Sequence, residues 1–130
     1  MRRLITYVMP RPFSGYNIPI AIQNTVLRDY CARNNLKYSL ATTELTTSEC
    51  FSMLKEIIEK NKEIDLGVTS AFVFPIYDKK KLTEILDLNK SNFRIHAVLE
   101  NFVMKKKDFL EWATELSAIH KIIPTYDSIN

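Results

Sequence analysis

Apolar residues along the chain alternate between short continuous runs and helical periodicities. Three runs, at residues 4–9, 64–74 and 93–99, are typical of buried strands. Residues 36–42 alternate apolar and polar positions, which predicts a fourth strand at an edge of the sheet. Apolar residues with helical spacing occupy the segments between and after them, at about residues 19–35, 46–60, 78–88 and 106–123. This order predicts a three-layer α/β/α domain in which right-handed crossovers build a four-stranded, mainly parallel sheet. The first run is apolar throughout, which predicts that strand one is central.

Length and composition agree with one compact domain. The chain has 130 residues, of which 46% are hydrophobic and 25% charged, enough to bury a core of its own. We expect the domain to span residues 1–123 and residues 124–130 to form a C-terminal tail, because Pro124 interrupts the last helical pattern. The N-terminal apolar run is too short for a signal peptide, and no run reaches the ~18–20 residues of a membrane span. These features predict a cytoplasmic protein without membrane insertion.

Charge and missing motifs exclude several function classes. The net charge of +3 is spread along the chain without a basic arm, which predicts no specific nucleic-acid binding and only a mild preference for anionic ligands. Gly15 and Gly67 are the only glycines, so neither a dinucleotide-binding loop nor a Walker loop is present. Cys31 and Cys50 have no nearby Cys or His, so no metal site is expected. No cofactor is predicted.

Candidate site residues follow the strands. In a parallel sheet, ligands bind at the carboxyl ends of the strands, where neighbouring connections diverge. Strand one is followed by a loop with two prolines and a glycine, strand three by a Thr-Ser pair, and strand four by Glu-Asn. From these loops and the first turns of the first helix, the predicted ligand-binding residues are Arg11, Ser14, Tyr16, Gln23, Asn24, Ser70 and Asn101.

Glu100 is the candidate catalytic residue. A carboxylate at the end of a buried strand is partly desolvated and can act as an acid or base. The alternative is a structural one, in which Glu100 caps a backbone segment or pairs with Arg11. For His96, within the fourth strand, a core histidine with one hydrogen bond is the alternative to a catalytic base.

One stretch resembles a known family. The letters QNTVLRDYCARNNLKYSLATTE at residues 23–44, with Pro19, the later FVFP and the strand HAVLE, resemble the sporadic carbohydrate cluster proteins of bacterial surface-glycan gene clusters. The resemblance implies a role in the biosynthesis of lipopolysaccharide, O-antigen or capsule. It carries over no catalytic residues.

Two further similarities are architectural. The order of strands and helices is similar to the catalytic domain of serine recombinases, a Rossmann-like or resolvase-like fold. Here Arg11 stands where that family has its nucleophilic serine, and the segment from Ser70 to Pro75 replaces its arginines. The resemblance therefore implies the fold without recombination. A Pro-Phe loop and a late glutamate are also similar to nucleoside deoxyribosyltransferase-like domains, which would make Glu100 a glycosyl nucleophile.

Two functional hypotheses follow, and the sequence leaves open whether the chain is an enzyme. In the first, an accessory protein acts on or binds an activated sugar or sugar precursor, such as a small anionic nucleotide-sugar. In the second, a non-catalytic module serves as a scaffold for a glycan-assembly enzyme, using the aromatic side chains of Phe72, Phe74 and Tyr77. A homo-oligomer is expected in either case.

Overall fold

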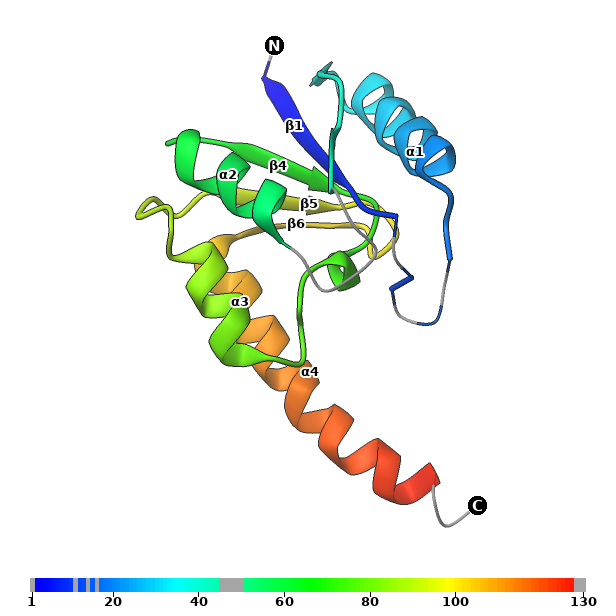
Figure 1. Ribbon diagram of the computed structural model, residues 1–130, viewed down its shortest axis with the longest axis vertical. Coiled ribbons are helices and arrows are strands. Elements are labelled where there is room, and N and C mark those ends of the chain that lie inside the picture. The colour runs from blue at the N-terminus through cyan, green and yellow to red at the C-terminus, as the bar shows by residue number, and fades with distance from the viewer. Residues whose placement is uncertain (1, 11, 14, 16, 45–50, 128–130) are drawn as a thin grey trace.

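The computed structural model describes residues 2–10, 12, 13, 15, 17–44 and 51–127, with side chains up to residue 119. This part of the chain forms a mixed α/β fold in which a six-stranded, mostly parallel sheet is covered by four α-helices (Figure 1). The strands are β1 (Arg3–Val8), β2 (Lys37–Tyr38), β3 (Thr42–Thr43), β4 (Asp65–Val68), β5 (Arg94–Ala97) and β6 (Phe102–Lys105). The helices are α1 (Ile20–Arg33), α2 (Ser52–Lys60), α3 (Lys79–Leu86) and α4 (Lys106–Asp127), with a short 3-10 helix, η1 (Ala71–Val73).

The sheet has the strand order β2-β1-β4-β5-β6, and β3 also pairs with β1. The pairs of β1 with β2, β3 and β4, and of β4 with β5, are parallel, which confirms the predicted mainly parallel α/β sheet. Strand β1 lies inside the sheet, with neighbours on both sides. The predicted count of four strands is wrong for two reasons. The run at residues 36–42 forms two separate two-residue strands, and β6 pairs antiparallel with β5.

A tight turn explains the missed strand. Asn101 adopts the left-handed conformation with φ 55°, and its backbone N–H donates to the carbonyl of Val98 at 3.0 Å. Asparagine tolerates this conformation better than most residues, so the chain reverses directly after β5. The four residues of β6 then run antiparallel along β5 before α4 begins. The sequence pattern had assigned these residues to no strand.

Two other boundaries also differ. The apolar run at residues 64–74 leaves the sheet after Val68 and turns into η1, where the Ser70 side chain accepts a hydrogen bond from the backbone N–H of Phe72. Helix α4 continues past Pro124 to Asp127. Its C-terminal half projects beyond the sheet and the other helices (Figure 1).

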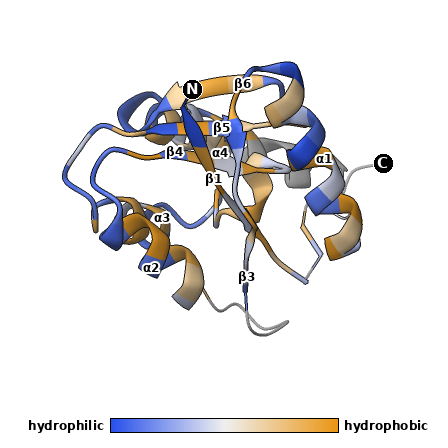
Figure 2. Cartoon of the chain, turned by 90° about the horizontal axis from the view of Figure 1, so that it is seen from above, coloured by the Kyte–Doolittle hydropathy of each residue, from blue (hydrophilic) through white to orange (hydrophobic). Residues whose placement is uncertain are grey.

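The crossover directions place helices on both sides of the sheet. The connection from β1 to β2 runs one way along the sheet, and the connections from β3 to β4 and β5 run the other way. Right-handed crossovers therefore put α1 on one face and α2 and α3 on the opposite face (Figure 2). The main core lies on the second face and includes Tyr7, Leu66, Ile95 and Phe109.

Gly67 leaves space that the Leu4 side chain of the neighbouring strand β1 fills. A Cβ atom at Gly67 would lie 2.7 Å from Cγ of Leu4, whose side chain is fully buried beside β4. We expect Gly67→Ala to destabilise the fold by about 1–3 kcal/mol through overpacking. The measurement is urea unfolding of the variant and of the double variant Leu4→Val/Gly67→Ala. The smaller valine relieves the clash, so the double variant should lose less stability than the sum of the two single changes. Strict additivity would contradict this packing.

Candidate functional site

The loops after β1 and β4 diverge at the carboxyl edge of the sheet. The chain leaving β1 reaches α1 on one face, and the chain leaving β4 reaches η1 and α3 on the other. Between them lies a groove of about 390 Å³. Its lining is mainly apolar and aromatic, from Met9, Pro12, Phe13, Phe51 and residues 72–78. This is the position at which open α/β sheets bind ligands.

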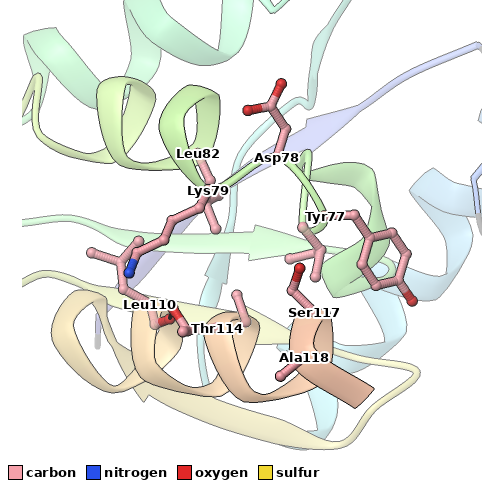
Figure 3. A pocket seen from close by; sticks show the side chains of 10 residues that line it. Tyr77, Asp78, Lys79, Leu82, Leu110, Thr114, Ser117 and Ala118 are labelled. Carbon is pink, nitrogen blue, oxygen red and sulfur yellow. Dashed lines mark hydrogen bonds between the residues drawn. The ribbon is translucent and has the colours of Figure 1, made fainter. Parts of the chain in front are cut away.

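A second hollow of about 570 Å³ adjoins the groove and shares Ile76, Tyr77 and Asp78 with it. It opens between the start of α3 and the middle of α4 (Figure 3). Lys79 and Leu82 lie on the α3 side, and the lining on the α4 side is Leu110, Ala113, Thr114, Ser117 and Ala118. We call the groove and this hollow together the carboxyl-edge site.

The polar groups of the hollow differ in their availability. The Asp78 carboxylate points away from α4 in Figure 3 and accepts a hydrogen bond from the backbone N–H of Lys81 at 3.1 Å. The Thr114 hydroxyl donates to the carbonyl of Leu110 at 2.8 Å. Ser117 is half-buried, and its hydroxyl has no hydrogen-bond partner among the described residues. Ser117 and Lys79 are therefore the groups best placed to bind a ligand.

Aromatic rings connect the groove to α4. The Phe72 ring lies 6.2 Å from the rings of both Tyr77 and Trp112, measured between centroids. Trp112 in turn contacts Phe102 and Phe109 at 5.1 and 5.6 Å. Tyr77 is the exposed end of this series, with 47% of its surface accessible. The edge therefore presents a tyrosine ring whose position is supported by packed aromatic neighbours.

The structure brings Glu100 and Ser70 together. The Glu100 carboxylate accepts a hydrogen bond from the Ser70 hydroxyl and another from the backbone N–H of Ala71, each at 2.7 Å. The Ser70 oxygen accepts from the backbone N–H of Phe72 at 3.2 Å. These contacts tie the turn between β5 and β6 to the start of η1, which matches the structural alternative of a backbone cap. The catalytic function of Glu100 stays a prediction.

The other predicted ligand residues occupy different environments. Gln23 is fully buried, and its amide nitrogen donates to the carbonyls of Met9 and Ile18, each at 2.8 Å. It therefore braces the loop after β1 from inside. Asn24 is half-buried, and its Oδ1 atom has no hydrogen-bond partner in the described part of the chain. Asn101 is exposed in the β5–β6 turn. Arg11, Ser14 and Tyr16 lie outside the described residues.

A polar cluster that the sequence did not predict lies at the opposite edge of the sheet. Asp65, the first residue of β4, has a side chain only 3% exposed and forms ion pairs with Arg2 and Arg94. Nε2 of His96 lies 3.5 Å from the same carboxylate, and Nδ1 of His96 lies 2.7 Å from the Tyr30 hydroxyl. His96 is thus a core histidine with one hydrogen bond, one of the two alternatives from the sequence. The cluster depends on strand register, which brings Asp65 of β4 directly opposite Arg94 of β5. The sequence pattern alone does not give this register.

Burial sets the protonation of this cluster. Burial lowers the pKa of His96, an effect that the nearby Asp65 carboxylate opposes and Arg94 and Arg2 reinforce. Burial also raises the pKa of Tyr30, so that its hydroxyl keeps its proton. The tautomer of His96 decides the direction of its hydrogen bond with the Tyr30 hydroxyl. In the tautomer that has its proton on Nε2, Tyr30 donates to Nδ1 and the Nε2–H group faces Asp65.

Comparison with protein families, curated proteins and solved structures finds no match to this chain. Within the described residues, no helix is long and apolar enough to cross a membrane. The same part of the chain contains no group of three or more His, Cys, Asp or Glu side chains that could hold a metal ion.

Replacing Glu100 tests its brace. Glu100→Ala leaves the Ala71 N–H without its acceptor, and we expect a loss of about 1–3 kcal/mol in the free energy of unfolding. Glu100→Gln should cost less, because an amide oxygen can still accept from Ala71 while the amide nitrogen donates to Ser70. Urea unfolding measures both, with Glu111→Ala on the exposed surface of α4 as the control. Equal stability of Glu100→Ala and the wild type would contradict the brace.

The lowered pKa of His96 predicts a pH dependence of stability. The unfolded chain, with a histidine pKa of about 6.5, takes up a proton before the folded chain as pH falls. His96 therefore contributes a loss of stability that begins near pH 6.5 and continues down to its folded pKa. Urea unfolding at several pH values should show a smaller loss for His96→Gln than for the wild type. Carboxylates common to both proteins cancel in the difference between their free energies of unfolding, so the difference reports on His96. Parallel curves of stability against pH would contradict the predicted contribution of His96.

Proposed function

We propose that the chain serves bacterial surface-carbohydrate biosynthesis by binding an activated sugar or sugar precursor at the carboxyl-edge site. The observation that carries this proposal is the pair of adjoining hollows at the edge where α/β sheets bind ligands. The biosynthetic context is supported by the resemblance of residues 23–44 to the sporadic carbohydrate cluster proteins.

The chemistry of the lining suits such a ligand. A volume of about 570 Å³ lies within the ~300–1,000 Å³ typical of small-molecule pockets. The Ser117 hydroxyl can exchange hydrogen bonds with sugar hydroxyls, and the Lys79 ammonium can bind a phosphate as a point charge. The exposed Tyr77 ring, at the junction of the two hollows, offers an apolar face with a polar tip.

A non-catalytic scaffold for a glycan-assembly enzyme is the second candidate. It is favoured by the hydrogen bond from the Ser70 hydroxyl to Glu100, which engages the candidate catalytic residue and one of the candidate ligand-binding residues. Catalysis by Glu100, including a deoxyribosyltransferase-like glycosyl transfer, would require the carboxylate to leave Ser70 and Ala71. A partner enzyme would contact the exposed Tyr77. Homo-oligomer formation stays part of both proposals.

Calorimetric titration with uridine diphosphate glucose and related nucleotide-sugars tests the first candidate. We expect saturable binding by the wild type and binding about tenfold weaker for Lys79→Ala, which removes one charge-assisted contact to phosphate. Lys90→Ala is the control, because it removes the same charge from an exposed turn outside the site. Binding to none of the sugars, or equal weakening in both variants, would overturn the sugar proposal.

The scaffold hypothesis is tested by affinity capture with the chain as bait. A glycan-assembly enzyme that the wild type captures should not be captured by the Tyr77→Asp variant.

A further inference from the structure

The amino edge of the sheet, opposite the carboxyl-edge site, carries two arginines held by one buried carboxylate. Asp65 contacts the Nε atoms of Arg2 and Arg94, the latter at 3.1 Å. Both arginine side chains stay partly exposed, at 57% and 40%. Neither has any other ion pair or hydrogen bond with a described residue. Their terminal guanidinium N–H groups are therefore available as donors, while Nε is fixed by Asp65.

A third cation completes the arrangement. Lys105 of β6 is the direct cross-strand partner of Arg94, so both side chains project from the same face of the sheet. Arg2, Arg94 and Lys105 line one hollow of about 410 Å³, in which Glu63 is the only acidic residue among the described lining residues. A neighbouring hollow of about 530 Å³ shares Arg2 and Glu63 with the first and adds Arg3, Lys60 and Lys62 to the same edge.

The charge balance of this edge is positive. Asp65 is buried beneath the two arginines and offsets one of their charges, and Glu63 offsets another. Lys60 is paired with Glu56 at 2.5 Å, so it contributes little. Lys105 and Lys62 are exposed and have no ion-pair partner among the described residues. The edge therefore favours a ligand with more than one negative charge.

We propose that Arg2, Arg94 and Lys105 form a binding site for the phosphate groups of a small molecule. Guanidinium groups match phosphate oxygens through paired N–H donors, and an ammonium adds a point charge. Asp65 orients both arginines before the ligand arrives, which lowers the conformational entropy lost on binding. The hollow is of small-molecule size, so the proposed ligand is a diphosphate or phosphate ester rather than a nucleic-acid strand. This site is separate from the carboxyl-edge site and does not depend on it.

Nuclear magnetic resonance titration of the full chain with inorganic pyrophosphate tests the site directly. The Nε–H resonances of Arg2 and Arg94 should shift saturably, while that of Arg28 on α1 should not. Lys105→Ala keeps the Asp65 ion pairs, so it tests binding without disturbing the fold, and we expect affinity to fall about fivefold or more. Lys90→Ala, an equal loss of charge outside the hollow, should leave affinity unchanged.

Three results would overturn the proposal. The first is the absence of saturable shifts up to about 10 mM pyrophosphate, which would place the dissociation constant above about 10 mM. The second is equal shifts with sodium chloride at matched ionic strength, which would indicate general screening. The third is tighter binding of a single-stranded oligonucleotide, with shifts that extend over Lys60 and Lys62, which would assign the edge to a nucleic-acid backbone.

Discussion

The buried carboxylate of Asp65 is the interaction on which the sheet most depends. It lies at the start of the middle strand β4 and holds Arg2 before β1 and Arg94 on β5, so one side chain joins three parallel strands at their amino ends. Removing one member of a buried ion pair leaves an uncompensated charge, which is far more costly than an exposed pair is stabilising. The register of β1, β4 and β5 is therefore fixed by charge at this edge as well as by the apolar core.

With the amino ends fixed, the carboxyl ends require separate restraints because their loops must diverge. Gln23 ties the loop after β1 to the start of α1, and Glu100 ties the loop after β4 to the β5–β6 turn. Both use buried or half-buried polar side chains to satisfy backbone groups that a loop leaves unpaired. The groove lies between these two loops, so both restraints act close to its walls, whereas the hollow lies between α3 and α4.

Local patterns in the sequence were sufficient for the mainly parallel α/β fold. They predicted β1, the four helices and the proximity of Ser70 to Glu100, because each depends on periodicity or on the rule that parallel strands end together. They missed β6, since four residues are too few to establish an alternation and the turn before them depends on one left-handed Asn101. The partners of Asp65 were also missed, since they are up to 63 residues away in sequence and depend on strand register.

The two edges of the sheet differ in whether a histidine lies close to the charged groups that could bind a ligand. At the carboxyl edge, no histidine is among the described residues that line the groove or the hollow. At the amino edge, Arg2 and Arg94 contribute to the lowered pKa of His96, which lies on the same face beside Asp65. An anion bound to these arginines would offset their charge and favour the protonated imidazole. Reciprocity of linkage then requires that protonation of His96 strengthen anion binding, so an occupied amino edge would take up protons as pH falls.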